Sequence, residues 1–189
     1  FKASEVAREI CYVARCLYHW RVHPGSISIN RDSKPYAFEA GRKAIQSHFD
    51  RLDIPANVVA GSMPLSYKIN YLQPPSSVSV IIPSRKCDKE LASGVKSVSN
   101  LSEDLCQEII VVSNQELKEN GFDKLMQQDK RIRFIYKNTL EVNRFILANS
   151  GAREARSESL VILDPSCVPI SNNWLSELIA PLARKDIAC

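Results

Sequence analysis

The stretch Val78-Ser-Val-Ile-Ile-Pro-Ser-Arg85 decides the fold of this 189-residue chain. It is an apolar run that ends at a proline and is followed by a hydroxyl and a guanidinium group. Two similar runs follow, Glu108-Ile-Ile-Val-Val-Ser113 and Ser159-Leu-Val-Ile-Leu-Asp164, and each ends in a small polar or acidic residue. Continuous Val, Ile and Leu runs are typical of strands buried on both faces, as in a parallel sheet covered by helices. The three runs therefore predict an α/β fold with a mostly parallel sheet.

The carboxyl ends of these expected strands carry the first candidate site. In open α/β sheets a ligand binds beyond the carboxyl ends of the strands. Ser84, Arg85, Ser113 and Asp164 stand at those ends, so we expect their side chains to gather on one rim of the sheet. This rim is where the sequence places the function.

Helical and extended patterns alternate after residue 77, which supports a sheet built from strand–helix units. The expected elements are a strand from Val78 to Ile82, a helix from Lys89 to Val98, a strand from Glu108 to Val112, a helix from Gln115 to Gln128, an edge strand from Arg131 to Tyr136, a helix from Asn143 to Arg156, a strand from Leu160 to Leu163 and a last helix after an N-cap at Ser171. On the helix before the last strand, we expect Phe145, Ile146, Ala148 and Ala152 to face inward.

The first 77 residues predict a smaller segment of helix and strand. A short helix is expected from Ser4 to Arg15, and Pro35 begins an amphipathic helix that reaches Leu52. Pro55 to Pro64 has the composition of a loop, and Tyr67 to Tyr71 alternates as a short strand. Gln73-Pro-Pro-Ser-Ser77 is typical of a linker.

Composition and charge narrow the class of protein. With 25 basic and 21 acidic residues, the net charge of +4 is too small to make nucleic acid the main partner. The sequence has no apolar run long enough to span a membrane. The six cysteines are scattered without a Cys-x-x-Cys pair, which favours reduced thiols in the cytosol over disulfides or zinc.

Val78 to Arg85, Glu108 to Asn114, Asn149 to Gly151, and Leu160 to Ser166 followed by Trp174-Leu175 are four pieces that, taken together, resemble the family 2 glycosyltransferases of the GT-A fold. The run from Val78 to Arg85 resembles the opening strand of the family, and Glu108 to Asn114 resembles the second strand, which in the family usually ends in Val-Asp. Asn149-Ser-Gly151 resembles the Asn-x-Gly helix. Leu160-Val-Ile-Leu-Asp-Pro-Ser166, followed by Trp174-Leu175, resembles the strand that bears the Asp-x-Asp motif. The resemblance implies a Rossmann-like, nucleotide-binding half of a GT-A domain.

The first half resembles the junction between two such modules in bacterial proteins with tandem glycosyltransferase domains. Cys16 to Ser26 resembles the closing segment of a preceding module, and Lys34 to Leu52 resembles the connector. The resemblance divides the chain into the tail of one module (1–33), a connector with a linker (34–77) and the N-terminal part of a truncated GT-A domain (78–189). On this interpretation the chain is a fragment of a bacterial tandem glycosyltransferase.

The resemblance also implies a function. The parent enzyme would transfer a sugar from a nucleotide-diphosphate donor to a saccharide or lipid-linked saccharide acceptor, in the synthesis of bacterial surface polysaccharide. The expected nucleotide-sugar contacts are Pro83, Ser84, Arg85, Ser113, Asn149 and Asp164. The catalytic base is expected beyond Cys189, so this fragment alone is expected to be inactive. A cytoplasmic location is expected, either free or peripheral at the inner face of the membrane.

Asp164 is the residue that the resemblance offers as a ligand for Mn²⁺ or Mg²⁺. The second acidic position of the family motif is Ser166 here, and a single carboxylate is a poor site for such hard ions. Ser113 likewise stands where the family usually has a nucleotide-contacting aspartate, and a serine makes no charge-assisted hydrogen bond. Metal dependence is therefore doubtful on the sequence.

The sequence leaves other interpretations open. The two serines favour a degenerate, non-catalytic glycosyltransferase-like scaffold or interaction module as the alternative function. A nucleotidyltransferase would need a glycine-rich phosphate loop after the first strand, where this chain has Pro-Ser-Arg-Lys. Individual residues also have structural roles open to them: Asp164 in a turn before Pro165, Ser113 at a strand end, Arg85 on a solvated loop, and Asn149 and Gly151 in the packing of a helix on the sheet.

Overall fold

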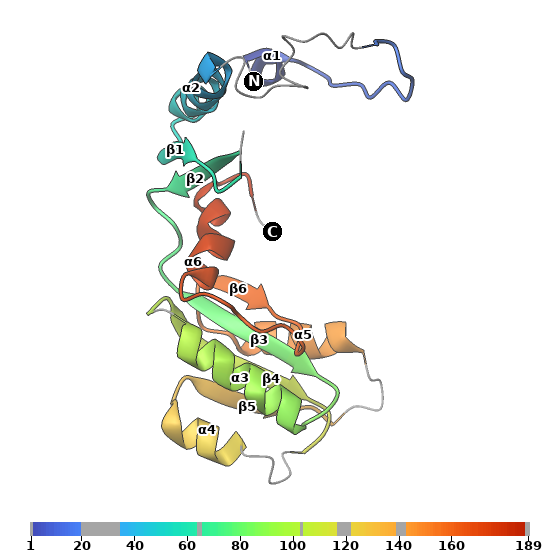
Figure 1. The fold of residues 1–189 in the computed structure, drawn as a ribbon. Helices are drawn as coiled ribbons and strands as arrows, with labels where there is room; N and C mark the ends of the chain where they lie inside the picture. The colour runs from blue at the N-terminus through green and yellow to red at the C-terminus, as the bar shows by residue number, and fades with distance from the viewer. Residues whose placement is uncertain are drawn as a thin grey trace. The chain divides into compact units, whose positions relative to one another are not determined.

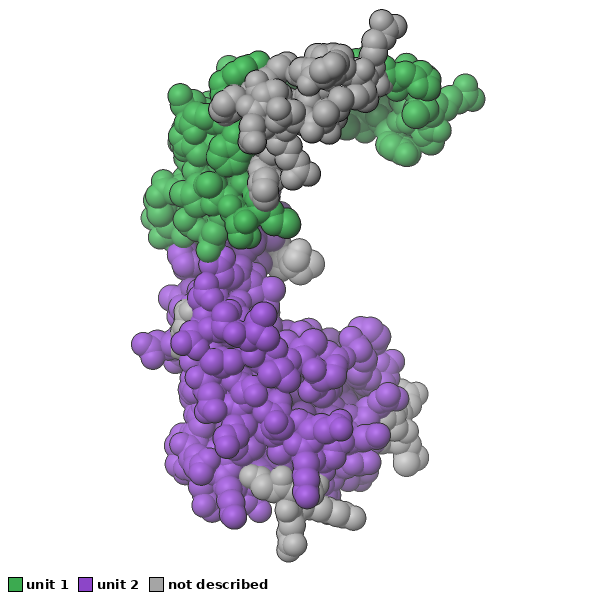
Figure 2. Space-filling view, in the orientation of Figure 1, with its two compact units in different colours: residues 1–73 green, residues 74–189 purple. Residues whose placement is uncertain are grey.

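The computed structural model describes residues 2–19, 35–63, 66–102, 104–116, 122–138 and 143–187 (Figure 1). The chain divides into two compact units, residues 1–73 and 74–189 (Figure 2). The division falls at the start of the proline-containing segment that the sequence predicts as a linker.

The first unit holds α1 (Lys2–Val6), α2 (Pro35–Arg51) and an antiparallel pair, β1 (Ala56–Ala60) with β2 (Tyr67–Tyr71). Its small core is formed by Phe49, Ala56 and Val58. The predictions of α2 and of β2 are confirmed. The expected helix to Arg15 was wrong beyond Val6. The segment expected as a loop after Pro55 was also wrong, because Ala56–Ala60 pairs with β2 and becomes a strand. Most of the expected closing segment lies outside the described residues.

The second unit is a four-stranded parallel sheet, as the sequence predicted. Its strand order is β5-β4-β3-β6, with neighbouring strands parallel throughout. The strands are β3 (Val78–Ser84), β4 (Cys106–Ser113), β5 (Ile132–Tyr136) and β6 (Ser159–Ile162). Each lies within two residues of its expected bounds, and β5 is an edge strand as expected. The α/β prediction is therefore confirmed.

Helices cover both faces of this sheet (Figure 1). The helices are α3 (Lys89–Leu101), α4 (Phe122–Gln128), α5 (Arg144–Glu154) and α6 (Trp174–Ile179), with a 3₁₀ turn at Ala180–Ala183. Successive strand side chains point to opposite faces. Val80 and Ile82 of β3 therefore pack in the core that contains α3, α4 and α6, and Ile81 packs in the core that contains α5.

The buried face of α5 differs from the prediction. Leu147, Ala148 and Gly151 are buried against the sheet, whereas Phe145 and Ile146 are 66% and 37% exposed. The helix lies very close to the sheet at Gly151, because a Cβ atom there would lie 2.6 Å from Ile81 Cγ2 and 2.9 Å from Val112 Cγ2. The absence of a side chain at Gly151 therefore lets α5 lie directly on β3 and β4.

Two further predictions needed correction at the end of the chain. The last helix has Asn173, not Ser171, at its N-cap, and no side-chain capping bond is formed there. The last strand is not buried on both faces, because Leu160 and Ile162 are 42% and 59% exposed. The reason is that α5 packs on β3 and β4 and leaves that side of β6 uncovered.

Candidate functional site

The candidate site lies where the order of the strands reverses. From β3 the chain adds β4 and then β5 on one side, and it returns through α5 to place β6 on the other side of β3. Ile81 is in register with Ile162, and the Leu163 N–H donates to the Ile81 carbonyl oxygen (2.8 Å). The segments that follow β3 and β6 therefore leave the sheet side by side. Such a reversal creates a crevice at the carboxyl ends of the strands.

A cleft of about 660 Å³ lies at this point. It is lined by Pro83, Ser84, Arg85, Lys86, Asp88, Glu90, Leu91, Gln115, Arg144, Asp164, Pro165 and Ser166. Four of the six residues expected to contact a nucleotide sugar are in this set, and they come from two separate strand ends. The sequence interpretation missed Lys86, Gln115 and Arg144 as candidate site residues.

Asp164 has hydrogen-bond partners on both carboxylate oxygens. Its Oδ1 accepts from the Ser166 N–H (3.0 Å) and from the Ser166 hydroxyl (2.6 Å), and its Oδ2 accepts from Arg144 Nη1 (3.1 Å). The Ser166 hydroxyl, the Ser166 backbone N–H and, to a smaller degree, the charge of Arg144 hold the pKa of Asp164 below its ordinary value. The carboxylate is therefore ionised at neutral pH and is already compensated by a cation.

The loop after β3 is shaped by Ser84. This residue is only 5% exposed, and its hydroxyl donates to the Lys86 carbonyl oxygen (2.7 Å) and accepts from the Lys86 N–H (3.3 Å). Gln115 joins this loop to the one after β4, because its Oε1 accepts from the Cys87 N–H (3.4 Å). The loop thus turns tightly and leaves Arg85 and Lys86 exposed at the cleft.

Ser113 and Asn149 are not among the residues that line the cleft. Ser113 is fully buried at the end of β4, and its Oγ accepts from the Gln115 N–H (3.1 Å). Asn149 is exposed on α5. Their expected contacts with a nucleotide sugar stay predictions. The neighbouring Asn114 has a buried Oδ1 with no hydrogen-bond partner in the part of the chain that the structure describes.

The carboxylates of the cleft do not fit a divalent cation. Besides Asp164, the lining contains Asp88 and Glu90, but Asp88 caps α3 by accepting from the Leu91 N–H (3.0 Å). Within the described ranges, no group of three or more His, Cys, Asp or Glu side chains is placed to hold a metal ion. Mn²⁺ and Mg²⁺ prefer several charged oxygen ligands. Here the central carboxylate has both oxygens engaged by protein donors.

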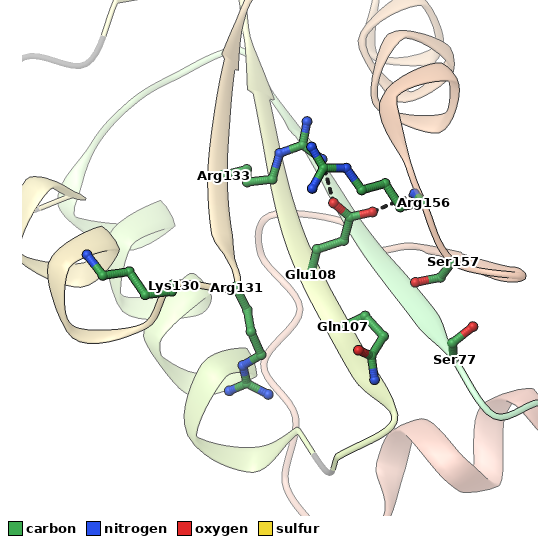
Figure 3. Close-up of a pocket in the computed structure, with 8 residues that line it drawn as sticks. All are labelled: Ser77, Gln107, Glu108, Lys130, Arg131, Arg133, Arg156 and Ser157. Atoms are coloured by element: carbon green, nitrogen blue, oxygen red, sulfur yellow. Dashed lines mark hydrogen bonds and ion pairs between the residues drawn. The ribbon is translucent and has the colours of Figure 1, made fainter.

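A second pocket, of about 340 Å³, lies at the opposite, amino ends of the strands (Figure 3). Glu108, 4% exposed, is its centre: it accepts from the Ser79 hydroxyl (2.8 Å), the Arg156 N–H (2.6 Å) and Arg133 Nη1 (2.5 Å). Burial raises the pKa of Glu108, but these hydrogen bonds outweigh burial and leave the pKa below its ordinary value. We interpret Glu108 as a structural anchor that ties the α5–β6 connection to β3 and β4.

Arg144 could have been found from topology. Because β5 and β6 are parallel, the helix that joins them must begin at the carboxyl ends and run back to the amino ends. The first residue of that helix therefore lies on the same rim as Asp164. Asn143 marks the helix start, since its side chain accepts from the Phe145 N–H (2.9 Å). The sequence signal for this site residue was therefore an N-cap residue, Asn143, followed directly by an arginine.

The family is shown by sequence comparison. Residues 79–189, more than half of the chain, match the family described as Glycosyl transferase family 2. The chain belongs to this family. The resemblance seen in the sequence is thereby confirmed, and the chain carries a GT-A, Rossmann-like α/β unit.

Two curated relatives and one solved structure illustrate the match. The chain is 32% identical to protein y4gI of Sinorhizobium fredii (strain NBRC 101917 / NGR234) over 96% of its length, and 23% identical to the O-antigen biosynthesis protein RfbC of Myxococcus xanthus over 98%. It covers 20% and 15% of those proteins. The mannosyltransferase PcManGT of Pyrobaculum calidifontis, solved with GDP-Man and Mn²⁺, is 17% identical, covers 86% of this chain and 45% of its own, and has a TM-score of 0.50.

The glycosyltransferase unit and its neighbour contain no membrane-spanning helix among the residues that the structure describes.

Proposed function

We propose that this chain forms the donor-binding part of a glycosyltransferase that moves a sugar from a nucleotide-diphosphate donor to a saccharide or lipid-linked saccharide acceptor. One observation carries the proposal: the cleft at the strand reversal brings Arg85, Lys86, Arg144 and Asp164 to one place. A cleft with guanidinium and ammonium groups suits a diphosphate, and guanidinium groups bind phosphate oxygens with two parallel hydrogen bonds.

Different residues of the cleft would bind different parts of the donor. Arg85 and Lys86 lie on the tight loop after β3, where they compensate the negative charge that the leaving diphosphate carries. A carboxylate offers about four acceptor positions, and the contacts of Asp164 with Ser166 and Arg144 use three of them. The remaining position can accept a hydroxyl of the donor ribose or sugar. The base that deprotonates the acceptor is proposed to lie outside residues 1–189.

The cofactor that the resemblance implies is a divalent cation, and the Pyrobaculum mannosyltransferase was solved in complex with both GDP-Man and Mn²⁺. When bound in such a site, Mn²⁺ or Mg²⁺ compensates diphosphate charge. The donor set of this cleft does not fit such an ion.

The biological setting is proposed from the relatives. The similarity to the Myxococcus O-antigen biosynthesis protein supports a role in bacterial surface polysaccharide synthesis. A nucleotide-sugar donor would place the reaction in the cytoplasm, either in solution or at the inner face of the membrane. The division into a module tail, a connector and a truncated catalytic domain is part of the same proposal.

A degenerate scaffold is the second candidate. It is favoured by Ser113 and Ser166, which replace two acidic positions, and by the engaged oxygens of Asp164. A scaffold would keep the fold of the cleft without binding a nucleotide.

Calorimetric titration of the chain with UDP, GDP, CDP and dTDP, each with and without Mn²⁺, separates the two candidates. We expect one nucleoside diphosphate to bind, and Arg85→Ala to weaken it by about tenfold or more because a charged hydrogen bond is lost. Arg153→Ala is the matched control, since it removes an equal charge from the exposed far end of α5. If none of the four nucleotides binds under either condition, the donor-binding proposal is wrong.

A further inference from the structure

We infer that Arg144, rather than a divalent cation, supplies the counter-charge at Asp164 for the donor diphosphate. The inference rests on the proposed function and deepens it, because it states how this cleft binds a diphosphate with one carboxylate. Arg144 would then be a specificity-determining residue, because its guanidinium group binds the donor diphosphate without a metal ion.

The first observation is the use of the Asp164 carboxylate. Two protein donors occupy Oδ1, both from Ser166, and Arg144 occupies Oδ2 at 3.1 Å. A metal ion at Asp164 would have to displace a guanidinium, and among the described residues no group of three or more His, Cys, Asp or Glu side chains is placed to hold it. Ser166, at the second acidic position of the family motif, acts here as a hydrogen-bond donor to Asp164. A serine at this position therefore suits a site without a metal ion, since no second carboxylate is needed there as a metal ligand.

The second observation is the position of Arg144. It is the first residue of α5, whose start is fixed by the Asn143 cap, and its guanidinium carbon lies 5.5 Å from the centre of the Phe145 ring. Its contact with Asp164 uses one of the five N–H groups that a guanidinium offers. Arg144 can therefore keep Asp164 and present further N–H groups to a phosphate.

The third observation is that structural stability does not explain the ion pair. The side chains of Arg144 and Asp164 are 61% and 38% exposed. Ion pairs this exposed contribute little to folding. The pair nevertheless lies in the cleft at the strand reversal, beside Arg85 and Lys86. Arg85 and Lys86 thus offer further hydrogen-bond donors beside the pair, where a diphosphate would lie.

The test measures binding of the best nucleoside diphosphate from the panel above, in EDTA and in Mn²⁺, to the unmodified chain and to Arg144→Ala, Arg144→Lys and Arg153→Ala. For the unmodified chain we expect dissociation constants in EDTA and Mn²⁺ to agree within about twofold. Arg144→Ala should weaken binding in EDTA by about tenfold or more, because a charged hydrogen bond is lost. Arg144→Lys should weaken it less, because the positive charge remains, and Arg153→Ala should leave it unchanged.

A second readout follows the metal directly. The electron paramagnetic resonance signal of free Mn²⁺, compared with that of Mn²⁺ and nucleotide alone, should not fall when the unmodified chain is added, because Arg144 already occupies Oδ2 of Asp164. Circular dichroism of each variant shows whether it is folded. If the unmodified chain binds the nucleotide only with Mn²⁺, or if Arg144→Ala behaves like Arg153→Ala, the inference is wrong while the proposed function stands. If no nucleoside diphosphate binds in either condition, both are overturned.

Discussion

Replacing Gly151 by alanine tests how closely α5 must lie on the sheet. The added Cβ would meet Ile81 Cγ2 at 2.6 Å and Val112 Cγ2 at 2.9 Å. Carbon atoms in a packed core prefer separations of about 3.5–4.0 Å, so the new methyl group is too close by roughly 1 Å on two sides. Both neighbours are β-branched side chains within a fully buried strand interior, and they have little freedom to move away.

The size of the effect follows from two opposing terms. Overpacking of a close-packed core costs about 1–3 kcal/mol. Alanine in place of glycine within a helix returns about 0.5–1 kcal/mol. The difference of the two terms is about 0–2.5 kcal/mol, and because both clashes are with fully buried side chains we expect Gly151→Ala in its upper part, with the free energy of unfolding lowered by about 1–2 kcal/mol. With a urea dependence of about 2 kcal/mol per M, the middle of the usual range, the midpoint should fall by roughly 0.5–1 M.

Urea titration followed by far-ultraviolet circular dichroism measures this midpoint. Ser150→Ala, the adjacent change on the same helix, is the control and should shift it little. Because Arg144 begins the same helix, a displaced α5 should also weaken nucleotide binding, and titration of Gly151→Ala with the nucleotide measures this. A midpoint for Gly151→Ala equal to or above that of the unmodified chain would refute the close packing of α5 and its role in positioning Arg144.

Three further predictions concern the stability that the carboxylates of Glu108 and Asp129 contribute. Glu108→Gln should lower the free energy of unfolding by about 1–3 kcal/mol at neutral pH, because a buried hydrogen-bonded charge is lost; an unchanged urea midpoint would contradict the anchoring role. The pKa of Glu108 is lowered by folding, so its contribution is complete above its ordinary pKa and is lost as pH falls through the lower folded value; Glu108→Gln should therefore flatten the fall of the midpoint with acid. For Asp129, the hydrogen bond from Arg131 lowers the pKa from 3.8 to about 2, so its contribution should disappear between those two pH values, and Asp129→Asn should remove that part of the titration.

The local sequence pattern predicted the secondary structure correctly where burial along a segment follows one simple pattern. The run from Val78 to Ser84 is buried at each position, so its apolar continuity alone identified an internal strand. The helix from Pro35 to Arg51 was recognised from its amphipathic period and its initial proline. Asp164 was placed at a rim because it directly follows the apolar run Leu160 to Leu163, at the carboxyl end of the expected strand.

The local sequence pattern gave a wrong prediction where contacts with residues far away in the sequence determine the structure. Ala56–Ala60 follows a proline and has a weak pattern, and it becomes a strand through pairing with Tyr67–Tyr71. Phe145 and Ile146 are more apolar than Gly151, yet the glycine faces the sheet, because at its position α5 lies too close to β3 and β4 for a side chain. Hydrophobicity alone does not report that distance.

The sequence by itself determined the parallel α/β class, the family and the rim on which the candidate site lies. These features depend on runs of neighbouring residues: the apolar residues of each buried strand and the polar residue that follows them. The tertiary structure alone decided which side chains share the cleft. Arg144 and Asp164 are separated by 20 positions and meet through the strand reversal. Ser84 and Ser113 both end a strand, yet Ser84 lines the cleft and Ser113 does not. The physical reason is that charge pairing and burial depend on distances across the fold, which no local pattern contains.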